Sequence, residues 1–422
     1  MTPAITAGII TIITVCLLFS KHFPRCATAS MGAMAMIVFG VLSPSKVFNQ
    51  YSSSTIVVMM CMMIVGAALF ETGAAMYIGN LLAKITGGTE LGILIAIMIF
   101  GSFVSAFITL AGAFFMFMPI IISITLAAGL SYQKTLYAYA VSLFIGQQIT
   151  LIGGNGNMVS HNMLLELGYE GWGFFELLPY SIFMILILIP ATVLIACRWK
   201  FIIPGKQVIP TMAGDITGKE VPKKITGPMA TSMIILIAAI ILMAMDMDAA
   251  PMEVIAAIAA CLCLFTNCVT YKQAVKSVDF NALMMIAGMT AVAKGIQDAG
   301  TMELIVTPII GALNNLSPVI VILVIYIITA IGTQFMSNSA WVAVMSPLVI
   351  PLAGPLGIPV KAMAATVLLG SSAGLVTPMA NSIAAPIMEM GEFSLTEFAK
   401  TGLFQAFFSM ICAMLYIGIF LL

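Results

Sequence analysis

Long apolar runs are the feature that most constrains this chain. A helix needs about 20 apolar residues to cross the hydrocarbon core of a bilayer. The runs here are continuously apolar, which favours helices over the alternating strands of a membrane barrel. They lie at roughly 3–20, 26–42, 54–72, 136–164, 173–198, 228–246, 251–270, 279–297, 361–388 and 401–421. The sequence therefore predicts an all-α polytopic membrane protein.

Charge is too scarce to cover a soluble surface. Charged residues make up 8% of the 422 positions, against about 25% in a soluble domain. The formal net charge is zero, so the chain lacks the basic surface that binds nucleic acid. We therefore expect a multi-pass protein of the cell membrane, with the lipid bilayer as a partner and no nucleic-acid partner.

Two further apolar stretches, 91–128 and 318–356, are too long for a single span. Each is either a pair of ordinary spans or a re-entrant hairpin that enters and leaves on one side of the membrane. In the hairpin interpretation, the short polar side chains near the middle stand at the tip, where they can bind a carboxylate together with helix N–H groups. These side chains are Thr109 in the first stretch and Ser337, Asn338 and Ser339 in the second.

The two halves of the chain match each other. A shift of 227 places Gly73 on Gly300, and a shift of 224 places Asn157 on Asn381. We interpret each half as an inverted repeat with five spans and one re-entrant hairpin, joined by the polar linker 201–226. The first repeat, 1–200, contains spans within 3–72, the hairpin 91–128, an interrupted span 136–164 and the span 173–198; the second, 227–422, contains spans within 228–297, the hairpin 318–356, an interrupted span 361–388 and the span 401–421.

The basic residues set the expected orientation, because Lys and Arg collect on the cytoplasmic side of a membrane. With five spans in each half, 13 of the 16 basic residues fall on the side of the linker 201–226. The other side holds Lys46, Lys294 and Lys361. The linker is therefore expected to be cytoplasmic and both termini to lie outside. Replacing each hairpin with two ordinary spans gives the same count.

Glycine, proline and asparagine interrupt two spans at matched places. These residues are Gly153, Gly154, Asn155, Gly156 and Asn157 in the first half, and Thr377, Pro378 and Asn381 in the second. Gly and Pro unwind a helix, and unwound backbone is tolerated at membrane depth only where protein or a wet cavity satisfies it. Freed carbonyls can bind a cation, and the N-terminus of the next half-helix can bind an anion. Matched breaks in inverted repeats are typical of secondary transporters, so we predict a carrier of a small anion and no catalytic residues.

His161 lies four residues after Asn157, one turn further along the same expected helix. A histidine within a membrane segment is a candidate functional residue, and it can titrate near neutral pH and couple protons to transport. The alternative is a structural hydrogen bond.

The sequence resembles the divalent anion/sodium symporters, within the wider ion-transporter superfamily, over nearly the whole chain. In the second half, Ser337-Asn338-Ser339 is similar to the family's Ser-Asn-Thr hairpin motif, and Thr377-Pro378 is similar to its Thr-Pro signature. The pattern that follows this signature is carried by Asn381, Met388, Gly391, Phe393, Phe398, Lys400 and Gly402. In the first half, the sequence also resembles the stretch that follows the family's first Thr-Pro signature. The matching residues are Asn157, Leu165, Gly168, Phe174, Phe175 and Glu176.

The resemblance implies a homodimeric elevator transporter for a di- or tricarboxylate, with Na⁺ as the coupling ion and no organic cofactor. A transport domain made of the hairpins and interrupted spans would slide against a scaffold domain made of the spans within 3–72 and 228–297. Substrate would be bound by Thr109, Asn155, Asn157, Ser337, Asn338, Ser339, Thr377, Pro378 and Asn381. Sodium would be bound by Thr109, Gly153 and Asn157 in one half, and by Ser337, Asn338, Gly374 and Asn381 in the other.

The first half departs from the family pattern. Leu110 and Ala111 stand where the family has asparagine and threonine, and Gly154-Asn155 stands where it usually has Thr-Pro. These departures are compatible with one sodium site fewer, a different coupling ion or a different anion.

Other classes of function stay open at this point. His161 leaves room for a proton-coupled anion transporter. A cation/proton antiporter of the same superfamily would need a titrating carboxylate in the transport core, and the interrupted segments contain none. A membrane enzyme would need a catalytic set such as Ser-His, but the adjacent Ser160 and His161 point to different faces of a helix. A passive channel is a further alternative, although matched broken helices suit alternating access better.

Overall fold

The computed structural model describes residues 2–19, 23–74, 77, 89–127, 129–198, 225–245, 251–301, 316–334, 337–378, 380–381 and 383–422. The regular elements of these residues are helices, without a strand among them, which confirms the all-α prediction. The predicted linker 201–226 lies outside the described residues except for its last two positions.

The order of the helices in the first half recurs in the second. The first half contains α1 (Pro3–Phe19), α2 (Arg25–Val38), α3 (Pro44–Tyr51), α4 (Ser54–Glu71), α6 (Glu90–Ser105), α7 (Leu110–Ala127), α8 (Tyr132–Gly146), α9 (Asn155–Glu166) and α10 (Leu178–Arg198). The second contains α11 (Gly227–Ala244), α12 (Met252–Phe265), α13 (Tyr271–Ser277), α14 (Phe280–Asp298), α16 (Pro318–Gly332), α17 (Asn338–Val349), the 3₁₀ turn η2 (Ile350–Leu352), α18 (Val360–Ser371), α19 (Ala384–Met390), α20 (Leu395–Tyr416) and the π turn η3 (Ile417–Leu421).

Backbone conformation matches between the halves at the helix ends. The described residues with positive φ form four pairs at shifts of 224 to 228: Gly40 with Asn267, Gly73 with Gly300, Gly129 with Gly357, and Gly168 with Glu392. A left-handed residue directly after a helix satisfies the last carbonyls of that helix. Matched helices therefore end in the same way in both halves.

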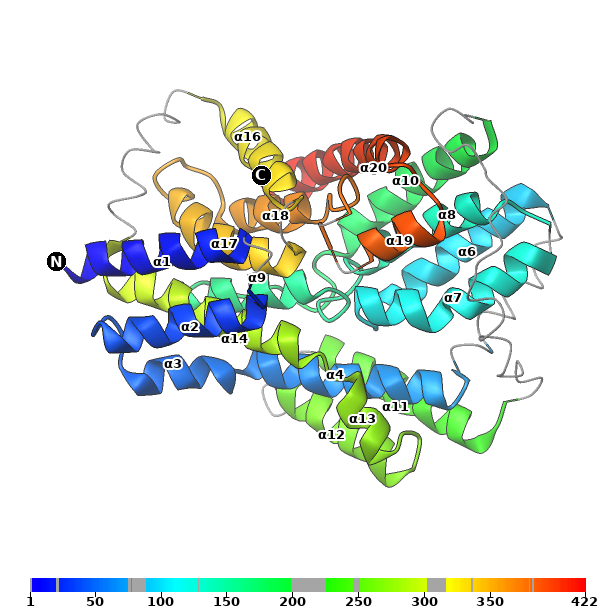
Figure 1. Ribbon diagram of the computed structural model, residues 1–422, viewed down its shortest axis with the longest axis horizontal. Helices are drawn as coiled ribbons and strands as arrows, with labels where there is room; N and C mark the ends of the chain where they lie inside the picture. The colour runs from blue at the N-terminus through cyan, green and yellow to red at the C-terminus, as the bar shows by residue number, and fades with distance from the viewer. Residues whose placement is uncertain are drawn as a thin grey trace.

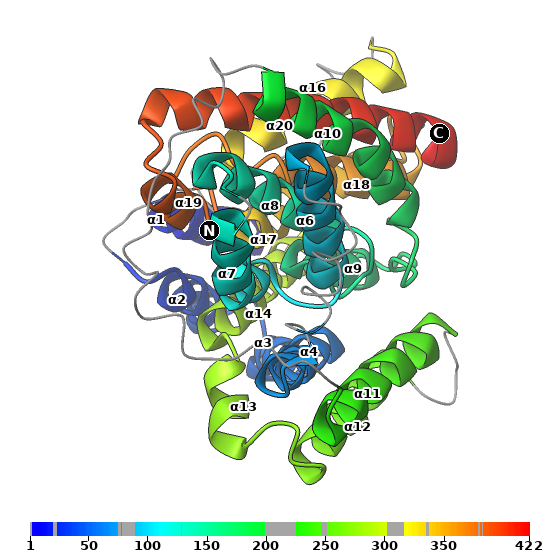
Figure 2. The ribbon, with the colours of Figure 1, turned by 90° about the vertical axis from the view of Figure 1, so that its right-hand side faces the viewer.

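The helices form two bundles. Matched helices pack on matched partners, which belong to the other half in the first bundle and to the same half in the second. In the first bundle, α1–α4 and α11–α14, helix α2 packs on α14 as α12 packs on α4, and α3 packs on α14 as α13 packs on α4. In the second bundle, α6–α10 and α16–α20, helix α6 packs on α8 as α16 packs on α18. Figure 1 shows the first bundle below the second, and Figure 2 shows the same layering from the side. The main contacts between the bundles are those of α17 and α9 with α14 and α4.

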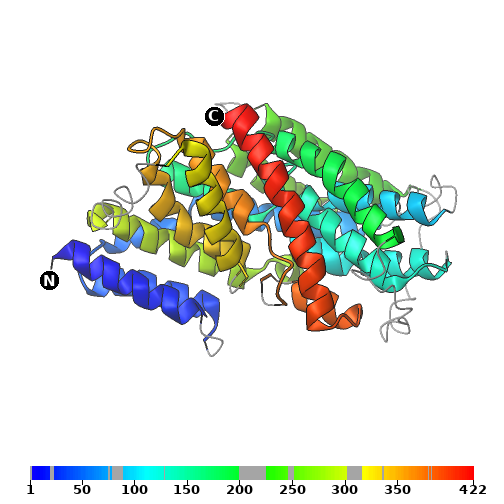
Figure 3. The same cartoon turned by 90° about the horizontal axis from the view of Figure 1, so that it is seen from above.

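Apolar side chains on the outside of the helices suit a lipid environment. Four helices of the described residues are long and apolar enough to cross a membrane: Pro44–Glu71, Leu178–Cys197, Gly227–Ala244 and Leu395–Leu421. Figure 3 shows the last of these running diagonally across the second bundle. Large apolar side chains are exposed along three of them, such as Leu186, Ile234 and Phe407, as expected where lipid replaces water.

Two short helices, α3 and α13, were not predicted from the sequence. Both are too short to cross a membrane, with 8 and 7 residues, and both contain several polar residues, so a search for apolar runs misses them. Pro44 begins α3 at a position that favours helix initiation, and Thr270 caps α13 together with Gln273.

Candidate functional site

The first helix break separates α8 from α9 and extends over residues 147–154. Asn157 is fully buried beside it. Its Nδ2 donates to the carbonyls of Gln147 at 2.7 Å and Thr150 at 3.0 Å. The side chain thus holds the unwound segment against the helix that follows.

The second break separates α18 from α19, and Asn381 has the corresponding role. Its Nδ2 donates to the Gly374 carbonyl. Its Oδ1 accepts from the backbone N–H groups of Ile383 and Ala384, each at 3.0 Å. Asn381 therefore caps the helix after the break while it binds the backbone before it.

Hydroxyl groups fasten each break to the preceding helix pair in the same way in both halves. Ser105 Oγ donates to the Leu143 carbonyl at 2.8 Å, and its counterpart Thr333 donates to the Ser371 carbonyl at 3.0 Å. Likewise Thr150 donates to the Ala106 carbonyl, and Thr377 donates to the Gln334 carbonyl at 2.6 Å.

This match corrects the sequence comparison. Gly154-Asn155 was interpreted as standing where the family has Thr-Pro, but the structure makes Thr150 the counterpart of Thr377. Gly154 and Asn155 instead form the N-cap and first residue of α9. The threonine is thus present in the first half, and only the proline is replaced, by Leu151.

Thr109 and Asn155 are brought together in the first half. Both line a cavity of about 190 Å³, together with Ile108, Gly112 and Met158. Thr109 directly precedes α7, and Asn155 begins α9. The cavity therefore lies at two helix N-termini, whose N–H groups favour negative charge.

Gly153 lies where three backbone carbonyls converge. A Cβ atom built at this glycine would lie 2.9 Å from the carbonyl oxygens of Ser105, Ala106 and Gln147. Such a cluster of oxygens suits a hard cation. Asn157 Oδ1, which is buried and has no hydrogen-bond partner among the described residues, adds a fourth oxygen close by.

In the second half, Asn338 lies against Gly374. Asn338 Oδ1 accepts from Thr333 Oγ1 at 3.2 Å, and it would lie 2.9 Å from a Cβ atom at Gly374. Ser337 is the N-cap of α17, and its buried Oγ has no partner among the described residues. Ser339 is buried in the first turn of the same helix.

The two breaks touch each other. Gln148 Nε2 donates to Ser372 Oγ at 2.8 Å. Gln147 Nε2 and Gln148 Oε1 are buried without a hydrogen-bond partner among the described residues. The region between the breaks therefore contains donors and acceptors that a bound solute or water can satisfy.

His161 does not lie at the first break. Its Nδ1 lies 3.0 Å from the Trp172 carbonyl, and the Trp172 indole donates to Ser160 Oγ at 2.9 Å. The ring also lines a separate cavity of about 760 Å³. His161 is thus bonded to the loop after α9.

Four residues of this region were missed in the sequence: Gln147, Gln148, Thr150 and Gln334. Gln334 donates to the Ala373 carbonyl at 2.6 Å and accepts from the Thr377 N–H at 3.3 Å. Two consecutive glutamines in an apolar span were a usable signal, because buried amides need partners. The shift of 227 also placed Thr150 on Thr377.

The lipid-facing helices and the paired helix breaks define a membrane transport protein. The chain belongs to the citrate transporter family, whose model matches residues 12–370. The family and the relatives below are transporters and not enzymes. This confirms the prediction of a transporter without catalytic residues and the resemblance to the divalent anion/sodium symporters.

Several named transporters are similar to this chain. The uncharacterized transporter YfbS of Escherichia coli (strain K12) is 26% identical over 188 residues, 44% of this chain and 30% of the relative. The probable sodium/sulfate cotransporter 3 of Chlamydomonas reinhardtii is 27% identical over 150 residues, 35% of this chain and 16% of the relative. The chain thus spans less than a third of these two proteins.

A longer match is with the sodium-dependent dicarboxylate transporter SdcS of Staphylococcus aureus. It is 21% identical over 429 positions, 94% of this chain and 82% of the relative. The crystal structure of the Alcanivorax borkumensis YdaH transporter shares the fold, with a TM-score of 0.66 at 12% identity over 99% of this chain and 98% of that one.

Proposed function

We propose that this protein is a secondary active transporter that moves a small anion, a di- or tricarboxylate, by symport with Na⁺. The observation that carries the proposal is the pair of matched helix breaks joined by Gln148 and Ser372. Buried acceptors and helix N-termini meet there, so a cation and an anion can be bound side by side. The sodium-dependent and sodium-coupled names among the relatives support this choice of ion.

The proposed sodium sites lie beside the two breaks. In the first half, Gly153, Asn157 and Thr109 would supply the site, with the carbonyls of Ser105 and Ala106. The convergence of oxygens at Gly153 fits such a cation. In the second half, Ser337, Asn338, Gly374 and Asn381 would supply the other site, and the unpaired Ser337 hydroxyl fits this role.

The substrate would lie between the breaks. Its carboxylates would be bound by hydroxyl, amide and backbone N–H groups. These groups belong to Thr109, Asn155, Asn157, Ser337, Asn338, Ser339, Thr377, Pro378 and Asn381. The breaks and tips, as far as they are described, contain no lysine or arginine. Binding without a fixed positive charge keeps the substrate readily released, and co-bound Na⁺ would supply the missing charge.

We further propose that the halves are inverted repeats and that the second bundle moves against the first as an elevator. The matched packing partners and paired positive-φ residues support the repeat. A homodimer with both termini outside completes the proposal. The contact of His161 with Trp172 favours a structural role over proton coupling.

The test is uptake of labelled succinate into proteoliposomes, with and without an inward Na⁺ gradient. Unlabelled citrate, sulfate and other anions would compete to rank substrates. Asn338→Ala should abolish Na⁺-stimulated uptake, whereas Asn281→Ala should retain it, because Asn281 lies in the first bundle and bonds Cys26. Uptake that ignores Na⁺ but follows a proton gradient would contradict the choice of coupling ion.

A further inference from the structure

The contact between the two bundles is polar at one end and apolar at the other. Three polar side-chain contacts among the described residues cross from the first bundle to the second, and all end on α9. They are Thr55 to Asn162 at 3.2 Å, Gln50 to Glu166 at 3.1 Å, and Lys294 to Glu166 at 3.3 Å. Towards the other end of α4, apolar side chains alone surround a small cavity between the bundles: Leu69, Phe100, Phe103, Val104, Phe107, Ile108, Phe117, Met233, Leu236 and Ile237.

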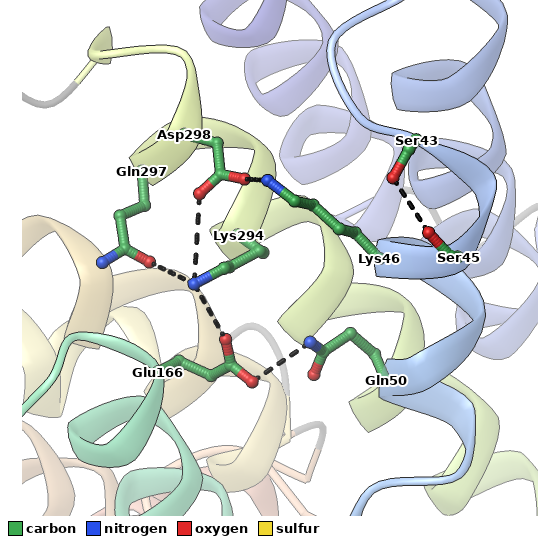
Figure 4. Close-up of polar contacts among 8 residues, drawn as sticks. All are labelled: Ser43, Ser45, Lys46, Gln50, Glu166, Lys294, Gln297 and Asp298. Carbon is green, nitrogen blue, oxygen red and sulfur yellow. Dashed lines mark hydrogen bonds and ion pairs between the residues drawn. The ribbon is translucent and has the colours of Figure 1, made fainter.

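Glu166 is the centre of the polar end. It is the last residue of α9 and it bonds two helices of the other bundle, α14 through Lys294 and α3 through Gln50 (Figure 4). Lys294 is in turn bonded within its own helix to Gln297 at 3.2 Å and lies 3.9 Å from Asp298. Asp298 is paired with Lys46 on α3. Gln50 and Lys294 of the first bundle therefore form a binding site, called the socket below, for the Glu166 carboxylate of the second bundle.

The matched positions of the other half lack this socket. The shift of 227 places Gln50 on Ser277 and Lys294 on Ala67, and the shift of 224 places Glu166 on Met390. The pair inside the first bundle does have a polar counterpart, because Gln273 Nε2 donates to Glu71 at 2.7 Å where Lys46 meets Asp298. The polar bond inside the first bundle is thus present in both halves, whereas the ion pair between the bundles has no counterpart at the matched positions Ala67 and Met390.

The bond between the bundles is accessible to water. The side chains of Lys294 and Glu166 are each 24% exposed, and both line the cavity of about 760 Å³. Water in that cavity can take over the hydrogen bonds when the groups separate. A partly exposed ion pair of this kind is weak enough to break in each cycle.

We propose that Glu166 is a releasable latch that holds the second bundle in the arrangement seen here. The inference rests on the proposed elevator motion, in which α9 moves relative to α3 and α14. Since the matched positions Ala67 and Met390 carry no charge, they cannot form an equivalent ion pair, and the latch favours one end state of the cycle. Glu166 would then be a positioning residue that touches neither substrate nor sodium.

A disulfide across the bundles can measure this preference away from the latch. A Cβ atom at Gly66 on α4 would lie 4.0 Å from the Cβ atom of Ile108, within the range for a disulfide. The rate of crosslinking in Gly66→Cys/Ile108→Cys reports how much of the time the bundles have this arrangement. Protection of both thiols from a maleimide mass tag measures it, against the same chain without the added cysteines.

We expect Glu166→Gln and Lys294→Gln each to slow crosslinking by about three- to fivefold. The double variant should be no slower than either single one, because both remove the same bond. The matched control is Lys134→Gln, which removes an ion pair to Glu90 inside the second bundle, between α8 and α6. It should leave the crosslinking rate unchanged.

Two outcomes overturn the latch: a crosslinking rate unaffected by Glu166→Gln, or one lowered equally by Lys134→Gln, which would indicate general loosening. Anion uptake is measured separately on the protein without added cysteines. If that protein transports no anion, the proposed function is wrong, whatever the crosslinking rates are. If it transports and Glu166→Gln still crosslinks at the original rate, the latch alone fails.

Discussion

Gln148 Nε2 donates a 2.8 Å hydrogen bond to Ser372 Oγ, and the two residues lie in the two helix breaks. Gln148 belongs to the first half of the chain and Ser372 to the second. The bond therefore joins the two halves at the centre of the proposed transport site.

Removal of this bond should impair transport more than folding. In Gln148→Ala, Ser372 Oγ loses the amide donor but still donates to the Leu368 carbonyl at 3.3 Å. We therefore expect the fold to lose only about 1 kcal/mol and sodium-driven uptake to fall at least tenfold. Gln405→Ala is the matched control, since Gln405 is a buried glutamine of α20 that bonds Ser409 on its own helix. Initial uptake rates and thermal unfolding check both variants. Equal losses in the two would argue against a special role for Gln148.

The convergence of carbonyls at Gly153 predicts intolerance of any side chain. In Gly153→Ala, the new methyl group would meet three carbonyl oxygens at 2.9 Å, so the break must distort and the proposed first sodium site would be lost. We expect uptake to become nearly independent of Na⁺. In Gly354→Ala, the methyl group has no neighbour within 4 Å, and uptake should be normal. Uptake against Na⁺ concentration distinguishes the two. A normal sodium response in Gly153→Ala would remove this site from the proposal.

Thr150 should behave like Thr377. Thr150→Val and Thr377→Val each remove a hydroxyl that binds a buried carbonyl, so each should destabilise the fold by about 1–2 kcal/mol and lower uptake. Serine at either position keeps the hydroxyl and should restore most of the activity. Thermal unfolding of the purified variants, read beside uptake, tests this. If only Thr377→Val lowers uptake, the two threonines match in structure but not in function.

His161→Gln should keep both transport and its pH profile. The glutamine amide can still donate to the Trp172 carbonyl that the imidazole contacts, so the structural hydrogen bond is kept. Uptake under a sodium gradient, measured from about pH 5 to pH 8, covers the range in which a histidine titrates. A profile that flattens in the variant would instead support proton coupling.

Much of the fold follows from local sequence. The apolar runs predicted the main helices because a chain in lipid must satisfy its backbone hydrogen bonds internally. Gly153 and Pro378 indicated the two breaks because they stand among further glycines and asparagines, whereas single prolines are accommodated inside α10 (Pro190) and α17 (Pro347). The apolar criterion missed α3 and α13 because they are short and contain several polar residues.

The candidate site was predicted less completely. Asn157 and Asn381 were identified from composition, but their roles as clamps on the unwound backbone emerged only from the structure. Thr150 was overlooked because the neighbouring glycines and asparagines gave the stronger local pattern. Its counterpart became clear when its hydroxyl and that of Thr377 were found on equivalent carbonyls.

The sequence by itself determined the class of protein, the course of the helices and the places where they break, because each depends on residues close together in the chain. The tertiary structure decided which groups meet: Gln148 with Ser372 across the breaks, and Glu166 with Lys294 across the bundles. Those partners are brought together by the packing of two similar halves, and no local pattern encodes the distance between them.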